Sequence, residues 1–473
     1  MSVRVSHWIN GRSVEPRNGR YRQGINPATG APGAEIAHGS AEDVDAAVTA
    51  ADEAARNWRR FPSARRGRLL GDLARAIRAN SEALVELEIE DTGKPRAEAA
   101  GEIEVGAAYF EFYAGLVNFP VGDTLDVEPG QHVYTRREPY GVIGVITPWN
   151  VPLNQAARAC APALAAGNVV VVKPASTSSQ TSVALARLAT EVGFPDGTFN
   201  VILGEGSDVG VELVRHPAVR KVAFTGSVAV GRTIGRIAAE RVIPLTLELG
   251  GKSANIVFED ADLEFAAKEA VRAFATNAGQ VCSAGTRLLV QRSIHDQFVK
   301  LVVEATRSRR PGKNLGPMIT RAQYQQVQEY FDVARQEGMT AEIGGDLPAD
   351  DALGGGFYVN PTVYSNVDNS SRMAREEVFG PVLVTIPFDS EEDALRIAND
   401  SDFGLVAAVW TKDISRALRL AEDIEAGQIF INTWSTGAVQ TPFGGYKLSG
   451  YGREKGIEAL NHYGQLKCVV VKF

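Results

Sequence analysis

The run VIGVIT at residues 142–147 decides the fold, together with three similar runs that follow it: VVVVK (169–173), FNVIL (199–203) and KVAFT (221–225). Each run is short and mostly apolar, and the segments between the runs have the composition of helices. Continuous apolar strands that alternate with helices are typical of a parallel sheet covered on both faces. The alternation resumes after Leu247 with NIVF (255–258) and RLLVQ (287–291), which predicts a second α/β unit.

The segments outside these runs predict hairpins and a helical region. Asn10-Gly11 is typical of a tight hairpin turn. Residues 123–139 predict a projecting hairpin, and LKCVVVKF (466–473) predicts an edge strand for subunit pairing. Apolar residues recur at helical spacing in three segments: 44–58, 64–91 and 96–117.

Length and composition narrow the class of protein. A chain of 473 residues is too long for one hydrophobic core, which predicts two or three domains. The formal net charge of −8 argues against a nucleic acid or an anionic membrane as the main partner. Three cysteines, no long apolar stretch and no secretion signal at the N-terminus predict a cytoplasmic protein that does not enter a membrane.

Cys282 is the first candidate for chemistry. It lies in NAGQVCSAGTR (277–287), where small residues on both sides allow a ligand to approach the backbone closely. A thiol becomes a nucleophile when its pKa falls or a cation approaches it, but a single cysteine is more often a small buried residue. We interpret Cys160, among alanines in a predicted helix, and Cys468, in the terminal strand, as structural.

Glu248 lies in LTLELGGK (245–252), an apolar strand that runs into two glycines. Burial of a carboxylate raises its pKa towards the range that a general base needs. The alternative is a structural ion pair with a nearby cation.

Asn150 comes directly after the first quoted run, and ligands bind at the carboxyl ends of the strands of such sheets. Its amide is a candidate donor to an oxyanion, and the alternative is a turn-forming residue before Pro152. Gly226 and Ser227 directly follow the fourth run and open a predicted helix whose backbone N–H groups suit a pyrophosphate. Neither GEG (204–206) nor GSVAVG (226–231) matches the dinucleotide fingerprint G-x-G-x-x-G, so each is weak evidence alone.

Together, these motifs resemble those of the aldehyde dehydrogenase superfamily over nearly the whole chain. Glu248 and Cys282 are 34 positions apart (282 − 248), the interval that the family shows between its base and its nucleophile. The matching motifs, in order, are TPWN (147–150), KPAS (173–176), FTGS (224–227) with Gly231, LELGGK (247–252), GQVCSAG (279–285), EEVFGPV (376–382) and PFGGYKLSGYGRE (442–454).

The resemblance implies an aldehyde dehydrogenase-like α/β fold with three parts. A Rossmann-type dinucleotide-binding domain would comprise residues 1–119 and 140–249, and an α/β catalytic domain residues 250–448. A small β oligomerisation element would comprise residues 120–139 and 456–473. The resemblance also implies a homodimer or homotetramer.

The same resemblance implies the roles of the catalytic residues. Cys282 would attack the aldehyde carbonyl, and Asn150 with the backbone N–H of Cys282 would hold the oxyanion. Hydride would then pass to the nicotinamide, and Glu248 would activate the water that hydrolyses the thioester. None of these steps requires a metal.

The implied cofactor is NAD or NADP. Lys173 would contact the adenosine ribose and Glu377 the nicotinamide ribose, with Phe379 beside the ring. The residues implied to bind the cofactor are Thr147, Trp149, Lys173, Ser176, Gly206, Gly210, Gly226, Ser227, Gly231, Leu249, Glu377 and Phe379.

Two positions depart from common members of the family. Ser176 stands where NAD-preferring members often carry Glu, which removes a charge that would repel a 2′-phosphate and predicts use of both cofactors. Arg158 stands where many members have Trp, and an Arg at a tunnel mouth would suit a carboxylate or a phenolate. The alternative is that Arg158 forms a structural ion pair. Trp434 would offer an aromatic wall, and Gly437 would leave room for a ring.

The predicted substrate is therefore a hydroxybenzaldehyde-type aromatic aldehyde or an anionic semialdehyde. One alternative function is a CoA-acylating semialdehyde dehydrogenase, although that branch dispenses with the base at Glu248. Another is a structural or binding homologue without activity, which the presence of Cys282, Glu248 and Asn150 disfavours.

Overall fold

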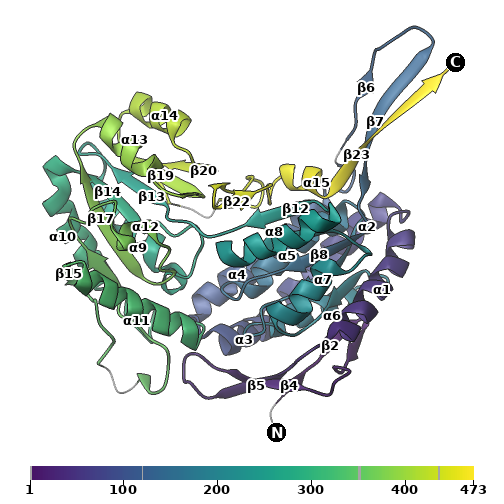
Figure 1. Ribbon diagram of the computed structural model, residues 1–473, viewed down its shortest axis with the longest axis horizontal. Helices are drawn as coiled ribbons and strands as arrows, with labels where there is room; N and C mark the ends of the chain where they lie inside the picture. Colours follow the sequence, from purple (N-terminus) through teal and green to yellow (C-terminus); the bar gives the residue numbers. More distant parts are fainter. Residues whose placement is uncertain (1–2, 120, 350–352, 435–436) are drawn as a thin grey trace.

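The computed structural model describes residues 3–119, 121–349, 353–434 and 437–473 (Figure 1). The four runs quoted above form adjacent parallel strands, as predicted. These strands are β8 (Val142–Ile146), β9 (Val169–Lys173), β10 (Phe199–Val201) and β11 (Val219–Thr225). β12 (Leu245–Glu248) continues the parallel sheet, and the outer strands are β2 (His7–Ile9), β3 (Arg12–Val14) and β22 (Gly450–Tyr451).

The strand order of this first sheet is β22-β12-β11-β8-β9-β10-β2-β3. After β8 the chain adds β9 and β10 on one side, and it then returns to add β11 and β12 on the other side. The connections that leave the carboxyl ends of β8 and β11 therefore diverge. Such a divergence opens the crevice in which doubly wound sheets bind ligands.

Helices cover both faces of the first sheet. α1 (Ala41–Trp58), α7 (Val211–Arg215) and α8 (Val228–Arg241) contact the sheet strands, and α7 contacts both other helices. α5 (Pro152–Ala165) packs between β8 and β9 and an outer helix, α4 (Arg96–Ala114), and its many alanines allow this close packing on two sides. The remaining helices here are α2 (Ser63–Ala79), α3 (Ser81–Thr92) and α6 (Gln180–Glu191).

One predicted helix is interrupted. The sequence predicts a continuous helix over residues 64–91, but α2 ends and α3 begins at Asn80. Asn80 has φ −104° and ψ 15°, outside the α-helical range, and its side-chain amide donates to the carbonyl of Ala76 at 2.8 Å. Hydrogen bonds of this kind compete with helix continuation, whereas the apolar spacing on either side is that of one helix.

The second predicted α/β unit is also present. Its sheet has the order β15-β16-β17-β14-β13-β19-β20, parallel except at β15, and its buried apolar residues form a core of their own. The strands are β13 (Ala254–Val257), β14 (Arg287–Gln291), β15 (Ala341–Ile343), β16 (Thr362–Tyr364), β17 (Val382–Phe388), β19 (Val406–Trp410) and β20 (Gln428–Ile431). The helices of this unit are α9 (Leu263–Ala275), α10 (His295–Thr306), α11 (Arg321–Gln336), α12 (Arg372–Arg375), α13 (Glu391–Asn399) and α14 (Ile414–Asp423).

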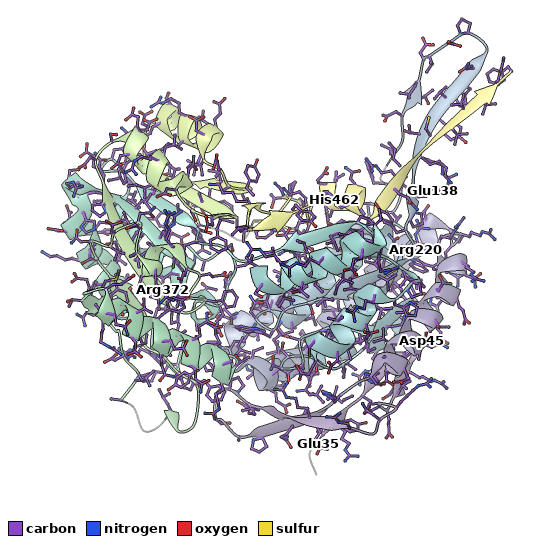
Figure 2. The ribbon with its side chains drawn as sticks, in the orientation of Figure 1. Glu35, Asp45, Glu138, Arg220, Arg372 and His462 are labelled. Atoms are coloured by element: carbon purple, nitrogen blue, oxygen red, sulfur yellow. The ribbon has the colours of Figure 1, made fainter. Side chains whose placement is uncertain are left out.

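A three-stranded arm projects from the body, as predicted (Figure 1). It consists of β6 (Thr124–Leu125), β7 (Gln131–Pro139) and the C-terminal β23 (Gly464–Lys472), which pairs antiparallel with β7 along its whole length. Glu138, labelled in Figure 2, forms an ion pair with Lys467 that joins these two strands. α15 (Glu458–His462) leads into the arm.

The smaller N-terminal elements complete the fold. The predicted turn at Asn10-Gly11 joins β2 to β3, and both residues have positive φ. β1 (Arg4–Val5), β5 (Pro32–Ala37) and β4 (Tyr21–Ile25) form a separate sheet, and β18 (Phe403–Gly404) pairs with β21 (Tyr446–Lys447).

The two large sheets take their strands from opposite sides of the predicted boundary at residues 249 and 250, except for β22. The exact domain boundaries stay a prediction. Residues 1, 2, 120, 350–352, 435 and 436, which fall within the predicted domains, lie outside the described part of the chain. In the described ranges, every helix is too short or too polar to cross a lipid bilayer.

Candidate active site

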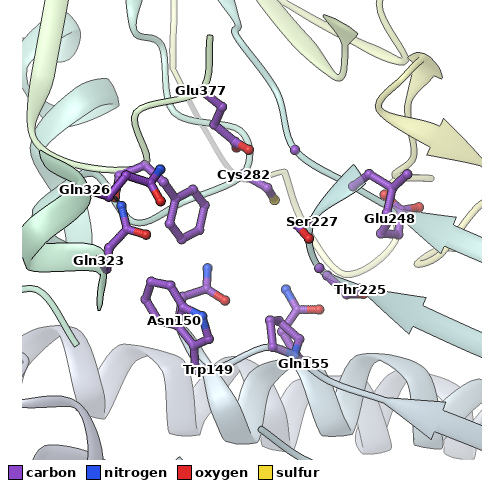
Figure 3. Close-up of a pocket in the computed structure, with 15 residues that line it drawn as sticks. Trp149, Asn150, Gln155, Thr225, Ser227, Glu248, Cys282, Gln323, Gln326 and Glu377 are labelled. Carbon is purple, nitrogen blue, oxygen red and sulfur yellow. Dashed lines mark hydrogen bonds between the residues drawn. The ribbon is translucent and has the colours of Figure 1, made fainter. Parts of the chain in front are cut away.

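Cys282, Glu248 and Asn150 line one cavity between the two sheets (Figure 3). Asn150 and Glu248 come from the carboxyl ends of β8 and β12 in the first sheet. Cys282 lies in the loop before β14, so it comes from the amino end of a strand in the second sheet. The lining residues are Pro148, Trp149, Asn150, Gln155, Thr225, Gly226, Ser227, Glu248, Leu249, Gly250, Cys282, Gln323, Gln326, Glu377 and Phe379.

The chain approaches Cys282 through an unusual backbone segment. Asn277, Ala278 and Gly279 are consecutive left-handed residues, with φ of 49°, 51° and 73°. A side chain at Gly279 would collide with the carbonyl of Gly380, since its Cβ would lie 2.1 Å from that oxygen. Left-handed residues other than glycine are uncommon and cluster at functional sites, where packing holds them in place.

The thiol of Cys282 is neutral in these surroundings. Burial raises its pKa to about 12, although the positive charge of Arg158 acts in the opposite direction. A thiol with this pKa is a poor nucleophile near neutral pH, because the thiolate is the reactive form. A cation or a base beside the sulfur would favour the reactive thiolate.

Asn150 is held by contacts from several segments. Its Nδ2 donates to the carbonyl of Gln280 at 2.8 Å, and its own backbone carbonyl accepts from Asn277 Nδ2 at 2.9 Å and Lys94 Nζ at 3.0 Å. One amide hydrogen is thus committed to the loop that carries Cys282, and Asn150 also lines the cavity. This arrangement suits a donor to an oxyanion formed at the sulfur.

Glu248 is almost completely buried, and neither carboxylate oxygen has a hydrogen-bond partner among the described residues. Burial raises its pKa well above the usual value for a glutamate. Arg158 opposes this shift, and the negative charge of Glu454 adds to it. A carboxylate with a raised pKa and free lone pairs is suited to accept a proton from water.

Arg158 is buried and does not line the cavity described above. It is 5% exposed, forms an ion pair with Glu454, and places Nη2 3.7 Å from Glu248 Oε2. Its guanidinium also lies 4.4 Å from the centre of the Phe443 ring. These contacts match the alternative, an ion pair within the protein, and a contact of Arg158 with a substrate stays a prediction.

The start of α8 provides the predicted site for a pyrophosphate. Ser227 caps the helix by accepting from the backbone N–H of Val230 at 3.4 Å, and Gly226 and Ser227 line the cavity. The first backbone N–H groups of a helix lack partners within the helix and attract phosphate oxygens. Gly231 allows Leu249 to pack against this helix, since a Cβ there would lie 2.7 Å from Leu249 Cδ2.

Lys173, Ser176, Gly206 and Gly210 gather at the carboxyl end of β9. The two glycines lie next to the Lys173 side chain, because a Cβ at Gly206 would be 3.9 Å from its Nζ and a Cβ at Gly210 would be 3.9 Å from its Cδ. Burial lowers the pKa of Lys173 to about 8. Thr147 is nearby, because its backbone N–H donates to the carbonyl of Lys173 at 3.2 Å, but Thr147 does not line the cavity.

Glu377, Phe379 and Trp149 form the opposite side of the cavity, where the resemblance implies a nicotinamide ribose. Glu377 accepts from the backbone N–H of Gly251 at 3.1 Å, and burial raises its pKa to about 7. Phe379 has φ of 54° and meets Trp149 edge to face, with ring centres 5.3 Å apart. A dinucleotide contact at Lys173, Glu377 and Phe379 stays a prediction, and of these three residues Glu377 and Phe379 line the cavity.

The two remaining predicted substrate residues do not line the cavity described above. Trp434 is buried and packs against Gly285, whose Cβ would lie 2.8 Å from the indole ring. Gly437 has φ of 66° and its carbonyl accepts from Lys455 Nζ at 3.2 Å. Residues 435 and 436, between them, lie outside the described part of the chain.

Several residues of the site are not predicted from the sequence. Gln323 of α11 donates to the carbonyls of Val378 and Phe379 at 2.9 and 3.0 Å, and it lines the cavity with Gln326 and Gln155. Gln323 and Gln326 lie outside every motif, so the sequence gives no signal for them. In the described ranges, His, Cys, Asp and Glu side chains form no group of three that could hold a metal ion.

Known proteins resemble this chain in both sequence and fold. The model of the aldehyde dehydrogenase family matches residues 14–469. A solved betaine aldehyde dehydrogenase from Staphylococcus aureus in complex with NAD+ is 39% identical, with 99% of this chain and 95% of that chain covered and a TM-score of 0.96. An indole-3-acetaldehyde dehydrogenase from P. syringae, in complex with NAD+ and IAA, is 37% identical, with 100% and 97% covered and a TM-score of 0.98. The aldehyde dehydrogenase KauB from Pseudomonas aeruginosa is 36% identical over the same shares, also with a TM-score of 0.98.

Proposed function

Since the chain belongs to the aldehyde dehydrogenase family, we propose that it oxidises an aldehyde to a carboxylic acid through a thioester on Cys282, with NAD+ or NADP+ as the oxidant. The observation that carries this proposal is the meeting of Cys282, Glu248 and Asn150 in one cavity that Gly226, Ser227 and Glu377 also line. Each group alone has an ordinary explanation. Together they supply a nucleophile, a base and an oxyanion donor.

When bound, NAD(P)+ supplies a positive charge near the sulfur and accepts the hydride. The Cys282 thiol gives up its proton to solvent and Sγ attacks the carbonyl carbon. The resulting oxyanion accepts hydrogen bonds from Asn150 Nδ2 and from the backbone N–H of Cys282. Loss of hydride from the carbon turns this adduct into a thioester. Glu248 then takes a proton from water, the hydroxide attacks the thioester, and the acid leaves as Cys282 regains its proton.

Glu248 distinguishes this reaction from the CoA-acylating alternative. In that alternative, a thiol resolves the thioester and no base is needed for water. Here, a buried carboxylate with a raised pKa and two unbonded oxygens faces the cavity, within the residues that the structure describes. Two buried carboxylate oxygens without hydrogen bonds are costly even with Arg158 3.7 Å away, which supports a role for Glu248 in hydrolysis.

The surroundings of Arg158 favour an uncharged aromatic aldehyde over an anionic semialdehyde. Arg158 is paired with Glu454 and faces Glu248, so a substrate carboxylate would compete with two carboxylates already in place. Phe443 covers the guanidinium and supplies an aromatic surface beside it. We therefore propose benzaldehyde or a hydroxybenzaldehyde as the substrate class.

A panel of aldehydes tests both the reaction and the substrate class. We expect kcat/KM for benzaldehyde and hydroxybenzaldehydes to exceed that for succinate semialdehyde by about tenfold or more, the effect of one unfavourable charge contact. The carboxylic acid should form in the same amount as NAD(P)H, with no need for CoA. Formation of an acyl-CoA when CoA is added would instead favour the alternative branch, and a preference for succinate semialdehyde would contradict the substrate class.

Arg158 would then act by positioning Glu248 and by setting its affinity for protons. An opposite charge near a carboxylate lowers its pKa, so Arg158→Leu should raise the pKa of Glu248 further. Because Glu248 must be ionised to act as a base, the acidic limb of the pH profile of kcat should move to higher pH. Arg158→Lys should keep the limb near its original position.

Glu454→Gln provides the converse test. Removing a negative charge near Glu248 should lower its pKa and move the acidic limb to lower pH. The positive charges of Arg453 and Lys455 also lower the pKa of Glu248, and both residues are kept in all three variants. An acidic limb that is the same in all three variants would contradict the positioning role of Arg158.

We also propose that the chain forms a homodimer or homotetramer through the arm. β6 and β23 are the edge strands of the arm, where other strands can pair, and the arm exposes apolar side chains. The exposed apolar residues of the arm are Leu125, Val127, Leu466, Val470, Val471 and Phe473. Cys282 must stay a free thiol to react, and free thiols persist in the reducing cytoplasm, which supports a cytoplasmic location.

A further inference from the structure

A polar cluster beyond the catalytic cavity joins three distant parts of the chain. Arg22, on β4 of the small N-terminal sheet, donates from Nη1 to Ser176 Oγ at 3.3 Å and forms an ion pair with Glu205. Ser176 Oγ also donates to Glu205 Oε2 at 3.3 Å. Arg22 and Ser176 are 154 positions apart in the sequence, and Arg22 and Glu205 are 183 apart.

This cluster changes the effect that we expect Ser176 to have on the choice of cofactor. On sequence alone, Ser176 marks the loss of an acidic group that would repel a 2′-phosphate. The structure places another carboxylate, Glu205, against the same hydroxyl, so negative charge is still present at this position. It also adds a cation, Arg22, that sequence reasoning does not predict.

The two charged groups are free enough to exchange partners. The side chains of Arg22 and Glu205 are 53% and 35% exposed, so neither is fixed by packing. Lys173, by contrast, is buried nearby, and the negative charge of Glu205 raises its pKa against the effect of burial. The polar cluster and its surroundings therefore contain a buried cation, Lys173, and two partly exposed groups that can move, the cation Arg22 and the carboxylate Glu205.

NAD+ and NADP+ differ only at the 2′ position of the adenosine ribose, the group that Lys173 and Ser176 are predicted to approach. The 2′-hydroxyl of NAD+ is a neutral donor, and a carboxylate is a good acceptor for it. The 2′-phosphate of NADP+ is a phosphomonoester with a charge between −1 and −2, for which an arginine is a suitable partner and a carboxylate is not. Arg22 and Glu205 thus respond to the two cofactors in opposite ways.

We propose that Arg22 and Glu205 together form the selector between NAD+ and NADP+, which rests on the function proposed above. Glu205 accepts the 2′-hydroxyl of NAD+ while Arg22 neutralises its charge. With NADP+, Arg22 leaves Glu205 and pairs with the 2′-phosphate. Use of both cofactors then depends on the opening of the Arg22–Glu205 ion pair, and not on Ser176 alone.

Direct binding tests this selector without relying on turnover. The dissociation constants of NAD+ and NADP+ are measured by calorimetry for the full chain and for Arg22→Gln and Glu205→Gln. We expect Arg22→Gln to weaken NADP+ relative to NAD+ by about tenfold, the usual effect of one charged hydrogen bond. Glu205→Gln should change the ratio in the opposite direction by a similar factor.

The exposed ion pair Arg187–Glu191 on α6 provides matched controls, with side chains 56% and 57% exposed. Arg187→Gln and Glu191→Gln make the same changes of net charge and should leave the ratio of the two constants as it is. The dependence of NADP+ binding on salt should also fall in Arg22→Gln, because one ion pair with the ligand is lost.

Three outcomes of the binding measurements distinguish the selector from the proposed function. Opposite shifts of the ratio in the two variants, absent from the controls, support the selector. Equal changes for both cofactors, with aldehyde oxidation intact, overturn the selector and leave the proposed function in place. Failure of the unaltered chain to bind either cofactor overturns both.

Discussion

Replacing Cys282 with alanine is expected to lower kcat for aldehyde oxidation by about 10⁴-fold or more, the scale found when a covalent nucleophile is removed. The reason lies in the order of events. Hydride leaves only from a carbon that has become tetrahedral by addition of the sulfur, and alanine cannot add to the carbonyl. Cys282→Ser should be nearly as inactive, because an alcohol is far harder to ionise than a thiol.

The two other cysteines provide the control for this experiment. Cys160 is fully buried within α5 and Cys468 is exposed on β23, and neither lines the cavity. Cys160→Ala and Cys468→Ala should therefore keep the activity of the unaltered chain. Mass spectrometry after mixing with aldehyde and cofactor should find the acyl group on Cys282 alone. Turnover by Cys282→Ala at an unreduced rate would refute the thioester route.

The strands and one half of the site follow from short-range patterns in the sequence. The runs at β8, β9 and β11 are apolar enough to predict buried parallel strands, and such strands present their carboxyl ends at one edge of a sheet. That rule alone directs attention to Asn150 and Ser227. Both line the cavity.

The second sheet contributes to the site in a different way, which the pattern could not predict. Cys282 precedes β14, and Glu377 precedes β17, so both come from amino ends of strands. The rule for carboxyl ends does not apply to them. They become candidates through composition and through resemblance to a family, and their meeting with Asn150 depends on how the two sheets face each other.

Pairs of charged side chains were the least predictable feature. Arg158 meets Glu454, and Arg22 meets Glu205, only because remote segments fold together. A charge pattern along the chain reports neighbours on one helix face, and it carries no information on contacts of this range. Each of these pairs changes the interpretation of a site residue, Glu248 in one case and Ser176 in the other.

Replacing Glu248 with glutamine should separate the two halves of the reaction. Formation of the thioester needs Cys282, Asn150 and the cofactor, whereas its hydrolysis needs a base for water. Glu248→Gln should therefore release about one equivalent of NAD(P)H per subunit in a rapid burst and then stop, with kcat lowered by a factor on the order of 10² to 10⁴. The acyl group should remain on Cys282 and be visible by mass spectrometry.

A small external nucleophile sharpens this test, since hydroxylamine attacks thioesters without help from a base. Its addition should restore turnover in Glu248→Gln, with the hydroxamate as product, and should have little effect on Cys282→Ala. A burst followed by normal turnover would show that another group activates water. Loss of the burst itself would contradict the assignment in a different way, because Glu248 would then be needed before the thioester forms, to take the proton from a thiol whose pKa burial raises to about 12.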